Sequence, residues 1–499
     1  MTKPCDLSAV EARRLIGRKA LSPVELMESC LARVAAVDHA VNAFSTLDAD
    51  GARAGAREAE AAVRRGGDGL GPLHGLPVGI KDLEETAGLR TTWGSPIFRD
   101  HVPAEDCGIV ARVRAAGGVV IGKTNVPEFG LGANTRNRVH GATGNPFDPT
   151  RTAAGSSGGS AVALATGMAP LCTGSDTGGS LRNPAAFCGI VGYRPSPGLV
   201  PAERRAHGWT PISVLGPMAR DVPNTALLLS AIASDDAMDP LAYTLHARPV
   251  RGRPALFHPM RGMDTAGLRL AWSEDFGQAL VERVVRDAFR ARVAALAPLF
   301  REAAPAHPDV SGGDEAFEVT RAAGVLSAHL ERVRTRPQDC GPNMHANVEE
   351  GLRYSLQDYA RAAASQTRIY RGFQRFFERH DVLVTPAITV SPRPWRELYP
   401  AEIDGALVRT YFHWLALAYY VSLVGHPAVC LPMGLDERGM PFGLQIVGPR
   451  GGDAFVLSVA AAVEEAFAAD PALRRPVPDL GALRAAPPIS GMEGFLGFG

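Results

Sequence analysis

The chain contains seven short apolar segments, most of which are apolar on consecutive residues rather than on alternate ones. A strand with one face in solvent alternates apolar and polar residues, whereas a strand covered on both faces is apolar throughout. The segments are therefore predicted to be strands of a sheet that is buried on both faces. They lie at residues 76–82, 118–124, 189–193, 268–272, 381–385, 427–431 and 442–447.

Segments with helical spacing of apolar residues lie between these strands. The main ones are residues 221–233, 280–299, 347–379 and 453–467. Strands that alternate with helices predict an α/β fold built on a large, mostly buried central sheet.

A chain of 499 residues is long enough for two lobes or for one large α/β domain. We expect one compact domain in five parts. These are an N-terminal helical layer (1–65), a first part of the core (66–234), an irregular and helical covering region that shapes a pocket (235–379), a second part of the core (380–470) and a proline-containing tail that crosses the surface (471–499).

The charge balance and the cysteines narrow the kind of partner. Acidic and basic residues are equal in number, at 52 each, so no nucleic acid and no anionic membrane is expected as the main partner, and a small molecule is. The seven cysteines are scattered and contain no CxxC pair, which argues against a disulfide framework or a structural zinc site. With a charged N-terminus that lacks the apolar core of a signal peptide, the sequence predicts a cytoplasmic protein.

Lysine is rare in this chain: only Lys3, Lys19, Lys81 and Lys123 occur among the 52 basic residues. Arginine stays charged in proteins, whereas a buried lysine can lose its proton and act as a base. Lys81 and Lys123 each end an apolar segment, where burial is expected. Position alone does not choose between them.

Two glycine-rich stretches, residues 151–160 and 173–182, place five serines close together, with no histidine between residues 141 and 206. Residues 155–159 match the G-x-S-x-G pattern of a nucleophile elbow, with Ser157 as the nucleophile, but the preceding residues read as a loop instead of the required strand. A Walker loop is excluded because no lysine follows either glycine cluster. For Ser160 and Ser175 the sequence indicates only a role in close packing.

Taken in order, several motifs resemble those of the amidase signature family of hydrolases. The resemblance rests on residues 73–82 (LHGLPVGIKD), 122–129 (GKTNVPEF), 145–160, 174–192, 216–220 (GPMAR), 425–427 (GHP) and 443–449 (GLQIVGP), and it covers most of the chain between residues 21 and 467. It implies the fold of that family, with a large mixed sheet and helices on both faces. One departure is Ala154, where many relatives have glycine.

The resemblance implies a catalytic triad without histidine: Ser180 as nucleophile, Ser156 as a bridging serine in a cis peptide after Gly155, and Lys81 as base. A lysine with the ordinary pKa of about 10.4 costs roughly 4.6 kcal/mol to hold neutral at pH 7, so the base has to be buried. Only the family pattern selects Lys81 over Lys123.

The remaining expected roles concern the loops around these serines. Consecutive N–H groups of Thr177, Gly178 and Gly179, with that of Ser180, can converge on one oxygen if glycine relaxes the backbone, so we expect an oxyanion hole there. Structural support is expected from Ser157, Asp176 and Arg182. The resemblance places Gly130 at the substrate, and it implies no metal and no cofactor.

We therefore expect an amidase that cleaves a small-molecule amide through an acyl-enzyme on Ser180. A carbamate (urethane) or ester hydrolase with the same triad, and the amidase-like subunit of a tRNA-dependent amidotransferase, remain alternatives, and a homodimer is left open. Pocket residues are expected from residues 130–134, from the region after residue 235, and from the aromatic residues of 411–414 with Tyr419 and Tyr420.

Overall fold

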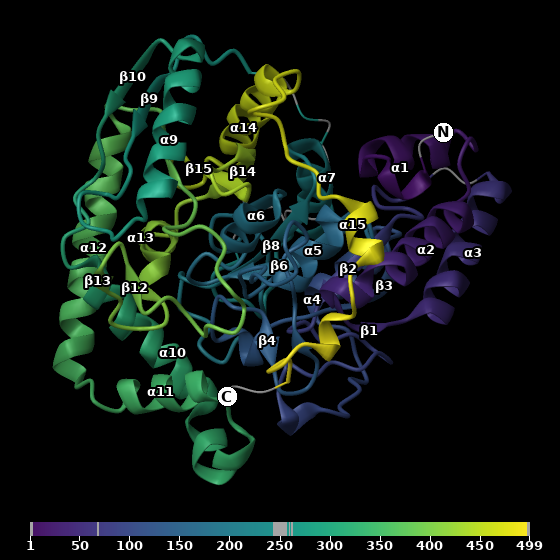
Figure 1. The fold of residues 1–499 in the computed structure, drawn as a ribbon, viewed down its shortest axis with the longest axis horizontal. Helices are drawn as coiled ribbons and strands as arrows, with labels where there is room; N and C mark the ends of the chain where they lie inside the picture. The colour runs from purple at the N-terminus through teal and green to yellow at the C-terminus, as the bar shows by residue number, and fades with distance from the viewer. Residues whose placement is uncertain (1–2, 67–68, 243–256, 259, 261–262, 497–499) are drawn as a thin grey trace.

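The computed structural model describes residues 3–66, 69–242, 257–258, 260 and 263–496. An 11-stranded sheet runs through it in the order β1-β3-β2-β6-β8-β7-β14-β15-β11-β9-β10 (Figure 1). The strands are β1 (Phe44–Leu47), β2 (Pro77–Lys81), β3 (Val119–Thr124), β6 (Leu171–Asp176), β7 (Val191–Arg194), β8 (Val214–Ala219), β9 (Arg269–Trp272), β10 (Glu302–Pro305), β11 (Val382–Pro386), β14 (Ala428–Leu435) and β15 (Pro441–Val447).

The sheet is mixed. Strand β2 pairs in parallel with β3 and β6, and β9 pairs in parallel with β10 and β11, while the other pairs are antiparallel. Two short hairpins lie outside it, β4 (Arg136–Asn137) with β5 (Gly141–Ala142) and β12 (Glu402–Ile403) with β13 (Ala406–Leu407). The predicted α/β fold with a large mixed sheet is confirmed.

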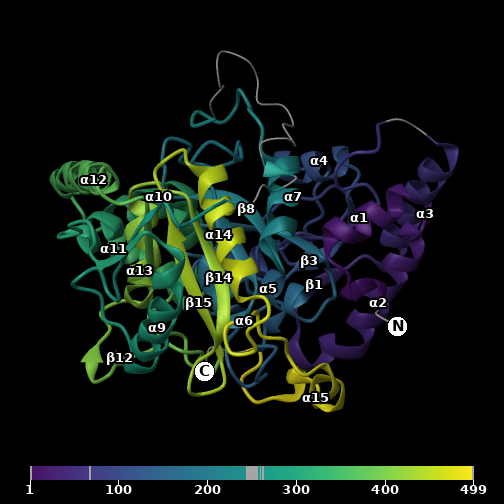
Figure 2. The same cartoon turned by 90° about the horizontal axis from the view of Figure 1, so that it is seen from above.

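Helices cover both faces of the sheet. Helices α5 and α6 pack on one face, and α4 and α7 lie on the other (Figure 2). The helices are α1 (Ala9–Gly17), α2 (Pro23–Val41), α3 (Ala49–Arg65), α4 (Gly108–Ala115), α5 (Gly158–Ala165), α6 (Arg182–Cys188), α7 (Val222–Ile232), α9 (Arg283–Leu296), α10 (Gly313–Thr335), α11 (Pro342–Gly351), α12 (Leu356–Phe377), α13 (Ala416–Leu423), α14 (Asp453–Phe467) and α15 (Leu480–Ala485).

All seven predicted strands are present in the 11-stranded sheet, but its other four strands, β1, β6, β8 and β10, were not predicted. Strand β6 reads LCTGSD, whose glycine and polar residues hide a strand that is almost fully buried. The helix predicted over residues 347–379 is wrong as a single helix. It divides into α11 and α12 because Ser355 caps a new helix, accepting from the N–H of Asp358 while the Asp358 carboxylate accepts from the N–H of Ser355.

Three segments surround the sheet. The N-terminal helices α1 to α3 form one end of the molecule, and α10 packs against α11, α12 and α13 at the other (Figure 1). The C-terminal tail crosses toward the N-terminal helices, where α15 packs on α2. The tail was expected to be irregular, and it also carries the short helix α15.

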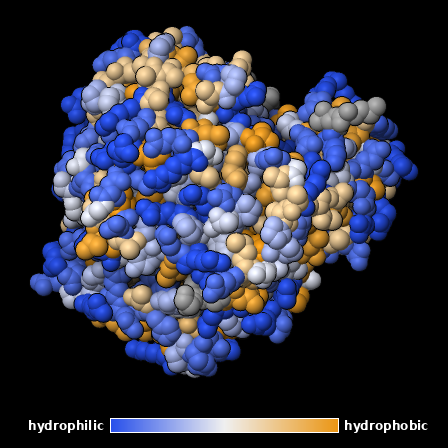
Figure 3. Space-filling model, in the orientation of Figure 1, coloured by the Kyte–Doolittle hydropathy of each residue, from blue (hydrophilic) through white to orange (hydrophobic). Residues whose placement is uncertain are grey.

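The face seen in Figure 3 is mostly hydrophilic, with apolar side chains in small groups. Among the described residues, no helix is both long and apolar enough to cross a membrane.

Candidate active site

The carboxyl ends of the neighbouring parallel strands β2 and β6 bring a lysine to a group of serine hydroxyls. Lys81 is the last residue of β2 and is fully buried. Its Nζ atom lies 2.8 Å from Ser156 Oγ, 2.7 Å from Ser157 Oγ and 2.9 Å from Ser175 Oγ. Ser175 belongs to β6, and the other two serines end the loop before α5.

The surroundings of Lys81 favour its neutral form. Burial lowers the pKa of the Lys81 ammonium, and the nearby carboxyl groups of Glu84 and Asp176 oppose that shift only in part. Burial also raises the pKa of Glu84, which weakens its ability to hold a proton on Lys81. An uncharged amine has two N–H groups and one lone pair, so one of the three serine hydroxyls can then donate to the nitrogen.

Ser156 and Ser157 lie at the junction between the glycine-rich loop and α5. The peptide bond between Gly155 and Ser156 is cis, the conformation that the family resemblance implies. Ser157 stands directly before α5, and Ser156 is buried but for 2% of its surface. The structure thus brings together three of the predicted residues, Lys81, Ser156 and Ser157.

Ser160 has the packing role that was expected, whereas Ser175 also has a contact that the sequence did not suggest. Ser160 is buried, contacts the hydroxyl of Thr124 at 2.7 Å and donates to the carbonyl of Thr173 at 2.9 Å, so it ties α5 to the sheet. Ser175 contacts the lysine nitrogen. Sequence reasoning missed it because β6 was not recognised as the strand beside β2.

The predicted nucleophile, Ser180, follows β6 in a short loop before α6. Its side chain is half-buried and lines a cavity of about 330 Å³ together with Thr177 and Gly178. Gly179 has a φ of +107°, and a Cβ there would lie 2.5 Å from both Ala418 Cβ and Asn183 Oδ1, so only glycine fits. The loop therefore presents Ser180 to the cavity through a turn that the sequence anticipated.

The structure changes the expected oxyanion hole at one position. The N–H of Gly179 donates to Asp176 Oδ1 at 3.0 Å, so this group already has a partner. Gly179 also does not line the cavity, whereas Thr177, Gly178 and Ser180 do. The backbone N–H groups of these three residues are the candidates that remain for the oxyanion hole.

A buried ion cluster fixes this loop. Asp176 accepts from Arg182 Nε at 3.0 Å and Nη2 at 2.9 Å, from Arg194 Nη1 at 3.0 Å and from the N–H of Leu181 at 3.2 Å. All three charged side chains are fully buried, and the two guanidinium groups hold the pKa of Asp176 far below its ordinary value. The expected pairing of Asp176 with Arg182 is present, and Arg194 adds a second cation that the sequence did not suggest.

Lys123 lies at a separate site. Its Nζ atom donates to the carbonyl oxygen of Glu84, to Thr86 Oγ1 at 2.9 Å and to Thr91 Oγ1 at 3.0 Å. Burial lowers its pKa as well. These three partners all lie outside the two glycine-rich stretches, so geometry now separates the two lysines that position alone did not.

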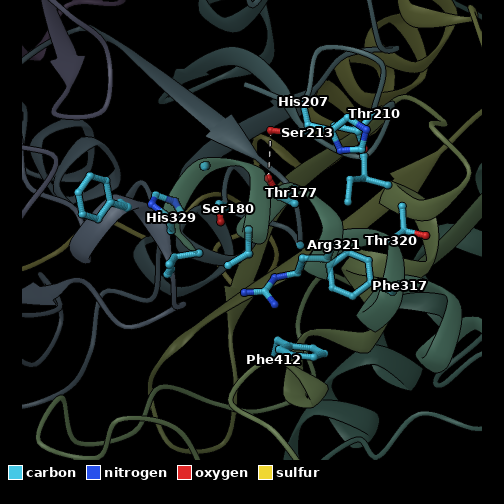
Figure 4. A pocket seen from close by; sticks show the side chains of 18 of the residues that line it. Thr177, Ser180, His207, Thr210, Ser213, Phe317, Thr320, Arg321, His329 and Phe412 are labelled. Carbon is cyan, nitrogen blue, oxygen red and sulfur yellow. Dashed lines mark hydrogen bonds between the residues drawn. The ribbon is translucent and has the colours of Figure 1, made fainter. Parts of the chain in front are cut away.

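Residues from distant parts of the chain enclose the cavity beside Ser180 (Figure 4). Gly130, Leu131 and Gly132 line it, as expected for part of residues 130–134. Of the aromatic residues expected at the pocket, Tyr411 and Phe412 do line it. Trp414 lines a different, small cavity, and Tyr419 and Tyr420 are buried and donate to Asp314 Oδ1.

Helix α10 forms one wall of the cavity. The sequence analysis expected pocket residues from the region after residue 235 but did not identify this helix. It contributes seven residues of the lining at helical spacing, Phe317, Thr320, Arg321, Gly324, Val325, Ala328 and His329. Burial and the nearby Arg332 and Arg321 lower the pKa of His329 to about 4, so it is neutral at pH 7.

Gly130, at φ +73°, faces Ser156: a Cβ there would lie 3.4 Å from Ser156 Oγ.

Comparison with known proteins gives a consistent result. The family model described as Amidase matches residues 25–457. The chain is 33% identical to an acylamidase of Rhodococcus erythropolis, over 92% of this chain and 95% of that protein. It is 35% identical to a glutamyl-tRNA(Gln) amidotransferase component of Roseiflexus sp. (strain RS-1), over 90% of this chain and 94% of that protein.

A solved structure agrees with these sequence matches. The crystal structure of a bacterial aryl acylamidase of the amidase signature family superposes with a TM-score of 0.84 at 25% identity, covering 96% of this chain and 98% of that one. From the sheet, the lysine–serine arrangement and these likenesses together, the chain belongs to the amidase signature family of amide-hydrolysing enzymes.

Proposed function

We propose that this protein is a serine amidase that cleaves a small-molecule amide, with Ser180 as nucleophile, Ser156 as proton relay and Lys81 as base. The observation that carries the proposal is the environment of Lys81: the amine is fully buried, and its hydrogen-bond partners are the three hydroxyls of Ser156, Ser157 and Ser175. No carboxylate of the described residues lies within 4 Å of it. An amine in such a place is suited to the neutral form that a base requires.

The reaction then runs in two stages. Ser180 Oγ attacks the amide carbonyl carbon, its proton moves to Ser156 Oγ, and the proton of Ser156 moves to Lys81 Nζ. The developing oxyanion takes hydrogen bonds from the N–H groups of the loop at Thr177, Gly178 and Ser180. The C–N bond breaks as the leaving nitrogen receives a proton through Ser156, which leaves an acyl ester on Ser180. Water cleaves that ester by the same relay.

The test compares two serine variants. Ser180→Ala should lose turnover of aryl acylamides and keep the circular dichroism spectrum of the wild type. Ser160→Ala is the matched control, because Ser160 is a buried serine that contacts Thr124 and Thr173 rather than Lys81. Intact-protein mass spectrometry after mixing with an activated acyl ester should show one added acyl group on the wild type and none on Ser180→Ala. Full activity of Ser180→Ala would end the proposal.

Esters and carbamates are secondary candidates for the same triad, because they differ in the leaving group and in the pocket that they require. A panel of aryl acylamides, aliphatic amides, carbamates and esters, assayed with wild type and Ser180→Ala, ranks them by kcat/KM. The preferred class is the one with the highest Ser180-dependent value.

A role within an amidotransferase complex has one observation in its favour, the 34–36% identity to several proteins named as components of glutamyl-tRNA(Gln) amidotransferase. It predicts that a second protein co-purifies and that glutamine is the only amide cleaved. Hydrolysis of acylamides by the isolated chain would favour the amidase.

A further inference from the structure

Arg321 is the unusual group of the cavity that holds Ser180. It comes from α10 and is only 9% exposed. In Figure 4 its side chain extends toward the middle of the cavity, and its guanidinium lies in this view between Ser180 and Phe412. A guanidinium carries a positive charge and five N–H donors, and it has no acceptor atom.

Neutral groups hold the Arg321 guanidinium in place. Nη1 donates to Asn347 Oδ1 at 2.5 Å, and Nη2 donates to the hydroxyl of Tyr411. The Arg321 Cζ atom lies 4.8 Å from the ring centroid of Phe412 and 5.2 Å from that of Tyr411. This frame fixes the orientation of the guanidinium plane and, within the described part of the chain, leaves three of its five N–H groups without a hydrogen-bond acceptor.

In the part of the chain that the structure describes, the charge of Arg321 has no paired carboxylate. Among the described residues no carboxylate lies within 4 Å of its guanidinium. Glu318 lies one turn earlier on α10, but its carboxylate pairs with other residues. Its Oε1 atom lies 2.9 Å from Arg409 Nη2 and 2.5 Å from His413 Nε2. Glu350, on α11, accepts from Tyr354 instead.

The other arginine of the cavity differs in this respect. Arg205 has a carboxylate partner, with Nη2 at 3.2 Å from both oxygens of Asp239, and its Nη1 donates to the carbonyl oxygens of Thr210 and Ser213. A buried charge costs several kcal/mol unless an opposite charge pairs with it. A buried, oriented guanidinium that lacks such a partner and faces a substrate cavity is built to receive an anion from outside.

We propose that Arg321 binds a carboxylate of the substrate, so that the preferred substrates are amides that carry an acidic group on their acyl or amine part. The inference rests on the proposed function, since the cavity is the substrate site only if Ser180 is the nucleophile. Two N–H groups on one edge of a guanidinium pair with the two oxygens of a carboxylate, which gives orientation as well as affinity. Phe317, Val325 and Leu415 supply the apolar wall for the rest of the molecule.

Two matched pairs of substrates test this and locate the acidic group. On the acyl side, glutaryl-p-nitroanilide is compared with pentanoyl-p-nitroanilide. On the amine side, p-acetamidobenzoate is compared with p-methylacetanilide. In at least one pair the wild type should show the higher kcat/KM for the acidic member.

Two variants separate anion binding from a structural role. Arg321→Gln should lower kcat/KM for the preferred acidic substrate by about 10- to 100-fold, mainly through KM, and change that of its neutral partner by less than about threefold. Asn347→Asp places a carboxylate beside the intact guanidinium and should cause the same selective loss. If Arg321 were only a clamp between α10 and its neighbours, Asn347→Asp would leave the selectivity unchanged and Arg321→Gln would affect both substrates alike.

A binding measurement keeps the inference separate from the proposed function. Glutarate and p-acetamidobenzoate are titrated by calorimetry into Ser180→Ala protein, with and without Arg321→Gln. Binding that Arg321→Gln removes supports the anion site at Arg321 independently of turnover, whereas a wild type that cleaves no amide fails the proposed function. The inference is overturned if neither ligand binds, or if both ligands bind equally well to the Ser180→Ala protein with and without Arg321→Gln.

Discussion

Replacement of Asp176 by asparagine should destabilise this protein more than any other single change of a buried carboxyl group to its amide. The Asp176 carboxylate neutralises Arg182 and Arg194, which are both fully buried, and it also accepts the backbone N–H groups of Gly179 and Leu181. Asparagine has nearly the same shape but no charge, and its amide group turns N–H donors toward guanidinium N–H donors.

The expected size of the effect follows from that geometry. Removal of one partner from a buried ion pair costs about 3–5 kcal/mol, because the other charge stays buried without compensation. With two guanidinium groups left in this state we expect a loss near the upper end of that range, against a total stability of about 5–15 kcal/mol for a typical domain. The loop that carries Ser180 should also lose its fixed position, so kcat should fall even where the variant is folded.

Asp453→Asn is the matched control. Asp453 is also buried, but its partners are neutral: the hydroxyl of Tyr193 at 2.6 Å and the N–H of Ser196 at 2.9 Å. Burial raises the pKa of Asp453, so its charge is not stabilised by the fold, and we expect a loss of about 1 kcal/mol.

Urea unfolding followed by circular dichroism measures both variants, and the pH adds a second check. Because the pKa of Asp176 is lowered in the folded protein, its stabilisation is complete above the unfolded value of about 3.9 and declines as the pH falls below it. The difference between wild type and Asp176→Asn should therefore be constant near neutral pH and shrink below about pH 4. Equal urea midpoints for Asp176→Asn and Asp453→Asn would refute the reasoning.

Three further changes probe the site. Because burial lowers the pKa of Lys81, kcat/KM should rise with pH and level off well below the ordinary lysine pKa of 10.5. Lys81→Arg should be inactive at every pH, because arginine does not act as a base. A rise of kcat/KM centred near pH 10.5 would contradict this reasoning. Ser175→Ala should lower kcat by about 5- to 10-fold with the fold intact, as one hydrogen bond to Lys81 is lost, and unchanged kcat would show that this contact is dispensable. Gly130→Ala should lower the free energy of unfolding by about 1–2 kcal/mol, because alanine is strained at φ +73°. It should also reduce kcat, because the added Cβ would lie 2.9 Å from Leu83 Cδ1 and 3.4 Å from Ser156 Oγ. Gly88→Ala, at φ +71° with open space around it, should lose stability alone; equal kcat for the two glycine variants would argue against crowding of Ser156.

The sequence was most informative where a pattern is local. Continuous apolar runs located seven strands, including β2, which ends at Lys81. Strand β6 escaped because glycine and hydroxyl residues interrupt its apolar character, although its neighbours bury it almost completely. Without β6 beside β2, nothing in the sequence indicates that Ser175 meets Lys81 in space.

Groups that depend on distant packing could not be predicted. Arg194 reaches Asp176 only because β7 and β6 both pair with β8 in the sheet. Arg321 sits on a helix that carries other arginines, and its burial depends on α11 and on the segment around Tyr411, far along the chain. A single sequence gives no sign of which arginine of such a helix points inward.

The cavity wall and the lysine–serine group are built by separate parts of the chain. Lys81, Ser156 and Ser175 are held by the sheet and the start of α5, whereas Phe317, Arg321 and His329 come from α10, which packs on other helices. A mutant library confined to the cavity-facing positions of α10 can therefore alter which amides are accepted while the bond-breaking groups keep their positions. Such a separation lets an enzyme acquire new substrates, in evolution or in directed evolution, while its catalytic mechanism stays the same.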